Sequence, residues 1–207
     1  MTPAHGIDEP AGKTGRRAEL LEIAAGLFAK RGLRATTVRD IADAAGILSG
    51  SLYHHFDSKE SMVDEILRVF LDDLFGKYRE IVASGRGARA TLEALITASY
   101  EAIDASHSAV AIYQDEVKHL VANERFAYLS ELNVEFRQLW LGVLERGVKD
   151  GSFRQDIDIE LAFRFLRDTA WVAVRWYRPG GSLTIDTVAK QYLAIVLDGL
   201  ASPRTSD

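Results

Sequence analysis

The 207-residue sequence predicts an all-α fold of about nine helices. No proline lies between Pro10 and Pro179, and because proline costs about 3 kcal/mol inside a helix, so long a proline-free stretch favours helices. Apolar residues also recur every three or four positions, as on one face of a helix, and glycines interrupt this pattern at intervals. These breaks place the expected helices at 16–31, 37–44, 48–54, 58–84, 88–106, 109–122, 124–150, 158–178 and 184–201.

The composition excludes several classes of protein. Hydrophobic residues make up 47% and charged residues 27%, which is typical of a globular chain that buries its own core. Cysteine is absent, so disulfides and thiolate metal sites are excluded and a reducing compartment is favoured. No apolar run approaches the roughly 20 residues of a membrane span, and the N-terminus lacks the apolar core of a signal peptide. We therefore expect a cytoplasmic protein that does not enter a membrane.

The net charge of −5 is unevenly distributed. Residues 1–60 hold eight basic and eight acidic side chains, whereas residues 61–207 hold 17 and 22. A neutral head on an acidic body is compatible with a small nucleic-acid-binding domain, although charge alone is weak evidence for one.

The sharpest local signal lies between residues 36 and 59. Thr37 can cap the second helix, and Asp40 three positions later makes a weak capping box. Gly46 suits the left-handed residue that often follows a helix end. The third helix begins only a few residues later, and two short helices joined so tightly match the spacing of a DNA-binding helix-turn-helix.

The third helix shows two faces when its residues are placed about 100° apart. Leu48, Leu52 and Phe56 lie four positions apart and are expected to point inward. Glycine on the other face would allow close approach to a groove wall, and hydroxyl and imidazole groups can bond phosphates or base edges. An ordinary solvated helix face is the alternative. The outward set is Gly50, Ser51, Tyr53 and His54.

Two helix starts add further donors. Lys59 lies in the first turn of the fourth helix, where the helix dipole disfavours a cation, so its amine is expected to share a phosphate with amide N–H groups. Thr37 and Arg39 place donors at the start of the second helix.

The neighbouring His54 and His55 point about 100° apart and would chelate a metal poorly, so we expect no metal site.

The segment TTVRDIADAAGILSGSLYHHFDSKESMVDEIL resembles the TetR family of bacterial repressors, and the resemblance covers about residues 16–70. It implies that the third helix enters the major groove. The family usually has a serine and then a lysine or arginine where this chain has Leu48-Ser49, so the usual cap and one cation are missing and the operator sequence does not carry over. The expected DNA-binding residues are Thr37, Tyr53 and Lys59 at phosphates, Arg39 beside them, and Ser49, Gly50, Ser51 and His54 at or near the bases.

The resemblance implies three parts: a flexible arm at 1–15, a three-helix helix-turn-helix domain at 16–60, and a six-helix ligand-binding and dimerisation domain at 61–203. In the family the last two helices usually pack against a partner chain. A symmetric homodimer is expected, because two heads must reach the two half-sites of a palindromic double-stranded operator. The apolar face expected there, or else in the internal core, is Leu193, Val196, Leu197 and Leu200.

The helix expected at 158–178 carries a row of arginines. Arg164 has acidic residues four positions away on either side, whereas the other three have none at three or four positions. Arginines on a partly buried helix need an anion, either from a ligand phosphate or carboxylate or from acids such as Asp115, Glu116 or Asp198. A tryptophan among them can stack on a flat ring. The stripe comprises Arg164, Arg167, Trp171, Arg175 and Arg178.

Aromatic residues either line an apolar cavity beside this stripe or belong to the plain core. An apolar cavity with an arginine mouth would suit a large amphipathic anion such as an acyl-CoA thioester, and we expect no cofactor apart from such an effector. The expected effector-binding residues are Arg167, Trp171, Arg175, Arg178, Phe163, Trp140, Phe136, Tyr113 and Tyr100, with Phe126 as a further aromatic candidate.

Four segments, RRAELLEIAA, ILSGSLYHHF, RDTAWVAVRWYRPGG and QYLAIVLDG, resemble a narrower group within the family, the actinobacterial repressors of cholesterol catabolism. This resemblance implies a repressor of steroid-degradation genes that is released by a CoA thioester of a steroid-derived bicyclic acid, with Arg167 and Trp171 as its main contacts. The alternatives are a TetR-family regulator of lipid metabolism or efflux that senses a fatty acyl-CoA or another apolar ligand and, more remotely, a helical acyl-CoA-binding enzyme. No nucleophile elbow, metal motif or phosphate loop is present, so we expect no catalytic residues.

Overall fold

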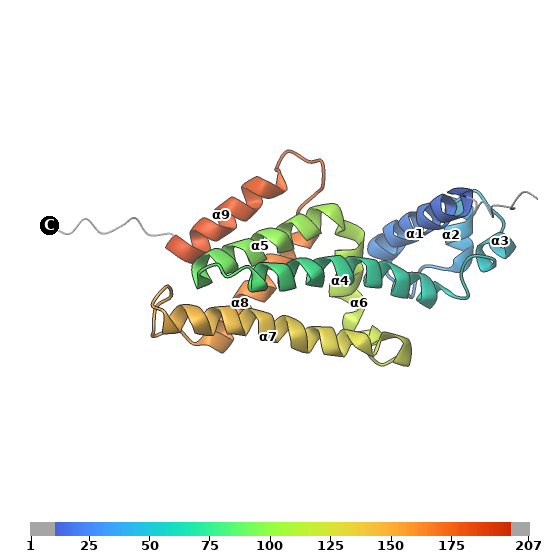
Figure 1. Cartoon of the computed structure of the whole chain (residues 1–207). Coiled ribbons are helices and arrows are strands. Elements are labelled where there is room, and N and C mark those ends of the chain that lie inside the picture. Colours follow the sequence, from blue (N-terminus) through green and yellow to red (C-terminus); the bar gives the residue numbers. More distant parts are fainter. Residues whose placement is uncertain (1–10, 200–207) are drawn as a thin grey trace, which may run out of the picture. The chain divides into compact units, whose positions relative to one another are not determined.

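The structure, a computed structural model, describes residues 11–199, and in that range it holds α-helices, two short 3₁₀ helices and no strand (Figure 1). The all-α prediction is confirmed, and nine α-helices are present among the described residues. Most of the predicted arm, Leu200, and the predicted ends of the last helix at 201 and of the second domain at 203 lie outside the described residues. No described helix is long and apolar enough to cross a bilayer.

The chain forms two compact units, of which the first ends at Ile66 and the second begins at Leu67. The domain limits expected from the sequence, 16–60 and 61–203, stay predictions. In the first unit, Leu20, Ile41 and Leu52, one from each of the first three helices, are almost completely buried. The first unit contains α1 (Ala11–Arg31), α2 (Val38–Ala44), α3 (Ser49–Tyr53) and the first turns of α4 (Lys59–Ala83).

Arg17 of α1 ties the end of α3 to the start of α4. Its Nε and Nη2 atoms donate to the two carboxylate oxygens of Glu65 at 3.0 and 2.5 Å, and its Nη1 donates to the His55 carbonyl. The guanidinium carbon also lies 4.1 Å from the centroid of the Phe56 ring, within the range of a cation–π contact. One side chain therefore fixes the position of a helix that is too short to be stable by itself.

The second unit is built around α5, which packs against α6, α7, α8 and α9 and lies beside α9 in Figure 1. Tyr78 of α4 is fully buried, and its hydroxyl donates to Ser99 Oγ at 2.6 Å, while Ser99 donates to the Leu95 carbonyl. This chain satisfies polar groups whose burial would otherwise be costly. The unit also contains α5 (Ala88–Ala105), α6 (His107–Leu120), η1 (Glu124–Phe126), α7 (Tyr128–Lys149), α8 (Ile159–Trp171), η2 (Val172–Arg175) and α9 (Ile185–Asp198).

The predicted helix at 158–178 is wrong in its second half. α8 ends at Trp171, and the chain tightens into the 3₁₀ turn η2 before Pro179. Tyr177 then anchors the segment, since its hydroxyl donates to Asp104 at 2.5 Å and its carbonyl lies 3.2 Å from His107 Nε2. The arginine stripe is therefore broken after Trp171, because the later arginines no longer follow the rotation of α8.

Candidate nucleic-acid interface and effector pocket

α2 is bounded by a capping box at its start and by a glycine just after its end. Thr37 Oγ1 accepts from the Asp40 amide at 3.1 Å, and the Asp40 carboxylate accepts from the Thr37 amide at 2.8 Å, so the predicted capping box is confirmed. The hydrogen bonds from the Thr37 side chain and backbone lower the pKa of Asp40. After α2, Gly46 has a φ of 66°, which only glycine adopts at little cost.

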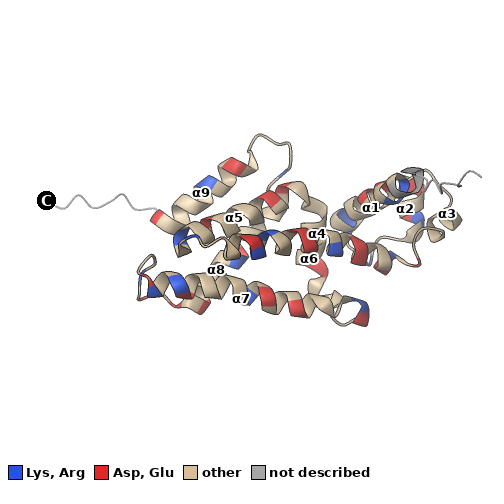
Figure 2. Cartoon of the chain, in the orientation of Figure 1, with Lys and Arg blue, Asp and Glu red and all other residues tan. Residues whose placement is uncertain are grey.

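The outward face of α3 is polar and holds no lysine, arginine, aspartate or glutamate. Gly50, Ser51, Tyr53 and His54 are all exposed, whereas Leu52 is 2% exposed and packs into the core. The helix consists of SGSLY, so it carries neither acidic nor basic side chains (Figure 2). A Cβ at Gly50 would meet no atom within 4 Å, so the open space outside this glycine is available to another molecule.

Leu48 does not point inward, and that expectation is wrong. Its side chain is 80% exposed, although Leu52 and Phe56 are buried as expected. The cause is that Leu48 is the N-cap of α3, with an extended backbone at φ −72° and ψ 143°, so helical spacing does not apply to it.

The remaining expected DNA contacts lie at the starts of two helices. Arg39 is exposed and pairs loosely with Asp43 at 3.8 Å, and Ser49 is half-buried. Lys59 has acceptors that the sequence did not indicate: its Nζ donates to the carbonyls of Leu33 at 2.7 Å and Thr36 at 3.2 Å. An ammonium group has three donors, so one is left for another acceptor, and the phosphate contact of Lys59 stays a prediction.

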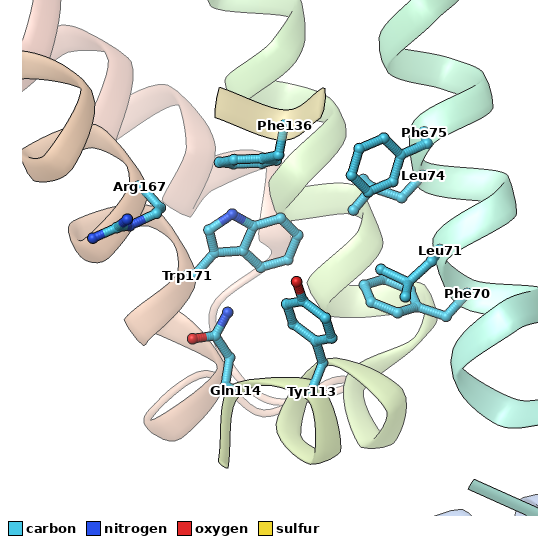
Figure 3. Close-up of a pocket in the computed structure, with 9 residues that line it drawn as sticks. All are labelled: Phe70, Leu71, Leu74, Phe75, Tyr113, Gln114, Phe136, Arg167 and Trp171. Carbon is cyan, nitrogen blue, oxygen red and sulfur yellow. The ribbon is translucent and has the colours of Figure 1, made fainter. Parts of the chain in front are cut away.

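The second unit encloses an apolar pocket between α4, α6, α7 and α8 (Figure 3). Its volume is about 60 Å³, and the Trp171 indole lies between the rings of Phe136 and Tyr113. The Tyr113 hydroxyl donates to Asn133 Oδ1 at 2.9 Å, and burial raises the pKa of Tyr113 to about 12, so it stays a donor at neutral pH. The lining residues are Phe70, Leu71, Leu74, Phe75, Tyr113, Gln114, Phe136, Arg167 and Trp171.

Four of the expected effector residues line this pocket and two lie directly behind it. The four are Arg167, Trp171, Phe136 and Tyr113. The ring centroids of Phe163 and Trp140 lie 6.0 and 5.4 Å from that of Phe136. Arg167 sits at the pocket edge with its guanidinium turned away from Trp171 in Figure 3, and its Nε donates to Asp168 at 2.7 Å.

Three expected effector residues lie away from the pocket, and the break after α8 explains two of them. Arg175 is exposed and its Nη2 lies 3.4 Å from Asp115 Oδ1, while Arg178 donates to the carbonyls of Arg175 and Tyr177. Tyr100 packs on Tyr192, with ring centroids 5.4 Å apart. The local acids also differ from the expectation, since Glu160 pairs with Arg137 and Asp168 with Arg167.

Sequence reasoning missed the largest contribution to the pocket, which comes from α4. Four apolar residues of this helix line the cavity, and Gln114 of α6 is a polar neighbour. Their helical spacing was visible, but the same spacing is typical of any core-facing helix. Nothing in a single sequence distinguishes a wall of a cavity from a wall of the core. The four residues are Phe70, Leu71, Leu74 and Phe75.

Trp140 is the polar exception in this region. Its side chain is completely buried, yet its indole Nε1 has no hydrogen-bond partner among the described residues. A buried donor without an acceptor costs about 1–3 kcal/mol. Phe136 both lines the pocket and contacts Trp140, with ring centroids 5.4 Å apart, whereas Trp140 itself is not a lining residue.

Models of two protein families match the chain. Residues 20–66 match the bacterial regulatory proteins of the tetR family, and residues 85–200 match the tetracyclin repressor-like C-terminal domain. The chain belongs to the TetR family. This TetR-family chain is 86% identical over 203 residues to the HTH-type transcriptional repressor KstR2 of Rhodococcus jostii (strain RHA1), covering 98% of this chain and 99% of that one.

Two further relatives come from Mycobacterium tuberculosis. The HTH-type transcriptional repressor KstR2 of strain CDC 1551 is 58% identical, over 94% of this chain and 98% of that one. A solved structure of the ketosteroid transcriptional regulator KstR2 of this species has a TM-score of 0.87 and 56% identity, covering 97% of this chain and 99% of that one. The TetR-family chain is thus a transcriptional repressor and not an enzyme, since its close relatives are named as repressors.

Proposed function

We propose that this TetR-family repressor binds a palindromic DNA operator as a homodimer, silences genes of steroid catabolism, and is released by a steroid-derived acyl-CoA thioester. The named relatives support the steroid part, because one is described as a ketosteroid transcriptional regulator at 56% identity. A bacterial regulator of this kind acts on chromosomal DNA, so we place it in the cytoplasm.

The exposed face of α3 supports the DNA-binding part of the proposal. Gly50 leaves room for a groove wall, while Ser51, Tyr53 and His54 are free to meet base edges and phosphates. Thr37, Arg39 and Ser49 add donors at the starts of α2 and α3. Lys59 donates two hydrogen bonds to carbonyls of the protein itself. We propose that its third N–H, together with nearby amides, contacts a phosphate.

Exposed apolar side chains support the homodimer. α8, η2 and the residue after η2 expose Leu161, Phe165, Val172 and Trp176, and Phe165 is 66% exposed. On α9, Ile195 is 48% exposed, whereas Leu193, Val196 and Leu197 are half-buried within the chain itself. Exposed apolar clusters of this kind mark protein interfaces, and a charge placed among them, as in Phe165→Asp, should shift the protein toward the monomer in sedimentation velocity.

The aromatic pocket with an arginine at its edge is the observation that carries the effector proposal. Rings from four helices offer flat apolar surfaces, and Arg167 offers a fork of donors for phosphate or carboxylate groups. The cavity of about 60 Å³ is far below the roughly 300–1,000 Å³ of a typical ligand site. A fused ring system therefore enters only if the surrounding helices move apart.

That widening provides a mechanism for release. Four pocket residues belong to α4, which runs as one helix from Lys59 to Ala83 and begins in the first unit. A ligand that binds the widened form more tightly shifts the population toward it. We propose that in this form the two recognition helices of the dimer no longer fit half-sites spaced one DNA turn, or a small multiple of it, apart.

The test is a titration of the protein–operator complex with a panel of CoA thioesters. We expect a steroid-derived bicyclic thioester to release the DNA and to raise the melting temperature of the free protein. Free CoA and the free acid serve as controls. Release by straight-chain fatty acyl-CoA, but not by the bicyclic ester, would replace steroid sensing with sensing of fatty acids. Unchanged binding at saturating concentrations of every ester would reject a thioester effector.

A further inference from the structure

We propose that Leu48 reads a thymine methyl group in the major groove of the operator. The inference rests on the proposed binding of DNA through α3 and adds a base-specific contact to it. Leu48 precedes the first residue of α3 and was expected in the core.

The first observation is that the apolar side chain of Leu48 is exposed to water. Leu48 is 80% exposed, which is the highest value among the large hydrophobic side chains of the described residues. Water contact with so much apolar surface is unfavourable, and nothing in the packing of the first unit compensates for it. The leucine therefore gains no stability in its present position.

The second observation is independent of the first and concerns the helix cap. Leu48 occupies the N-cap of α3, where a serine, threonine, aspartate or asparagine would accept an amide hydrogen bond, and no side-chain cap bond is present. Only the backbone carbonyl of Leu48 acts in the turn, by accepting from the Ser51 amide at 2.9 Å. A small polar residue would stabilise the fold more than leucine does. Both the exposed apolar surface and the missing cap hydrogen bond therefore disfavour leucine here.

The surroundings indicate what the leucine contacts. The exposed Gly50 and Ser51 lie two and three positions after it, and the N-terminal residues of a recognition helix are the ones that reach base edges. α3 has no arginine or lysine for guanine and no asparagine or glutamine for adenine. An apolar side chain distinguishes bases through the thymine methyl, which projects into the major groove, and Leu48 is the exposed apolar group that adjoins this face.

The experiment uses DNA that the full-length wild-type protein selects from a pool of randomised duplexes. Each thymine of the selected site is replaced by deoxyuridine, symmetrically in both half-sites, which removes only the methyl group. We expect one position to weaken binding about fourfold per half-site, the size expected for one buried methyl, and so by an order of magnitude in the palindrome.

Three variants connect that position to Leu48. Leu48→Ala should bind the thymine and deoxyuridine duplexes equally, and Leu48→Met should keep the preference. Leu48→Ser restores a capping side chain, so it should melt at a higher temperature than the wild type and yet bind the operator less tightly. This opposite movement of stability and affinity separates a reading role from a structural one.

Several outcomes would overturn the inference while leaving the proposed function intact. These are a selected site without thymine, equal binding of all deoxyuridine duplexes by the wild type, or an unchanged thymine preference in Leu48→Ala. Failure of the wild-type protein to select any sequence would instead overturn the proposed DNA binding itself. A loss of affinity in Leu48→Ala that is the same for every duplex would assign the leucine to general positioning and reject base reading.

Discussion

The two units of this repressor each keep one side chain in an environment that disfavours it, and they do so in opposite senses. In the first unit Leu48 exposes an apolar surface to water, and in the second Trp140 buries an N–H donor that finds no acceptor within residues 11–199. Departures from local folding rules concentrate at functional sites. The comparison therefore points to the same two regions as the motifs and the pocket do.

The two units also differ in whether their candidate sites could bind a ligand without a change of structure. The outward face of α3 is exposed as it stands, with open space beyond Gly50. The pocket holds only about 60 Å³, and the buried donor Trp140 lies behind its lining, in contact with Phe136. Under the proposed function, DNA meets a preformed surface, whereas an effector has to rearrange the helices around the pocket. A sensor needs this difference, because a ligand that fits a site without changing it cannot shift an equilibrium.

The largest expected effect tests the preformed surface. Gly50→Ala should weaken operator binding tenfold or more, the scale of about 1–3 kcal/mol for a specific base contact, because the new methyl occupies space that the groove wall needs. Its stability should not fall, since the Cβ meets no protein atom and alanine favours helices. Fluorescence anisotropy with labelled operator measures the first quantity and thermal melting the second.

The matched control for this substitution is Gly26→Ala in α1. A Cβ there also meets no atom within 4 Å, so the two variants should gain similar stability. Only Gly50→Ala should lose affinity for DNA. Equal operator binding by both variants would show that the backbone of α3 does not approach the duplex closely.

The next effect tests the anion site of the second unit. Arg167→Gln should weaken effector binding by about 10- to 100-fold, as expected for losing a hydrogen bond to a charged group, and leave operator binding without effector unchanged. Arg175→Gln should behave like the wild type, because Arg175 lies outside the pocket and is 68% exposed. Isothermal titration with the thioester distinguishes the two. An equal loss of effector affinity in both variants would mean that Arg175 also binds the effector, as the unbroken arginine stripe predicted.

A smaller effect tests the buried donor. Trp140→Phe keeps an aromatic ring and removes the N–H, so we expect the thioester to bind several-fold less tightly if a ligand oxygen reaches this donor once Phe136 moves. Operator affinity without effector provides the control, since Trp140 belongs to the second unit. An unchanged affinity for the thioester would assign Trp140 to the core alone.

The smallest effect tests the capping box of α2. Thr37→Ala should lower the melting temperature by about 2–4 °C, the usual consequence of losing an N-cap in a chain of this size. The lowered pKa of Asp40 means that its ionised form stabilises the fold at neutral pH and that this contribution is lost as the pH falls below about 4. The difference between variant and wild type should therefore be full at pH 7 and shrink near pH 3. A difference independent of pH would exclude the Asp40 carboxylate.

The first unit was largely predictable because its signals are local. Thr37, Asp40 and Gly46 determine a cap and a turn within a few residues, and the structure contains both. The prediction for Leu48 was wrong because helical spacing was extended one residue beyond the helix. The use of Lys59 was also missed, since its acceptors are carbonyls more than 20 positions earlier in the chain.

The second unit was less predictable because its pocket depends on four helices that are distant in sequence. Arg167, Trp171, Phe136 and Tyr113 were expected there, yet the α4 wall was not. Arg178 was misplaced because the change from α8 to the 3₁₀ turn depends on tertiary anchors at Asp104 and His107. Periodicity in a sequence cannot show where such anchors end a helix.

The Arg17 clamp has a consequence for how operator preference can change. α3 spans only Ser49–Tyr53, and the residues just after it are held by one guanidinium on α1, which contacts Glu65, the Phe56 ring and the His55 carbonyl. We expect mutations around this arginine to shift α3 without altering any of the residues that we propose to contact bases. Evolution can thereby retune which promoters are recognised from a position more than 30 residues upstream of the recognition helix.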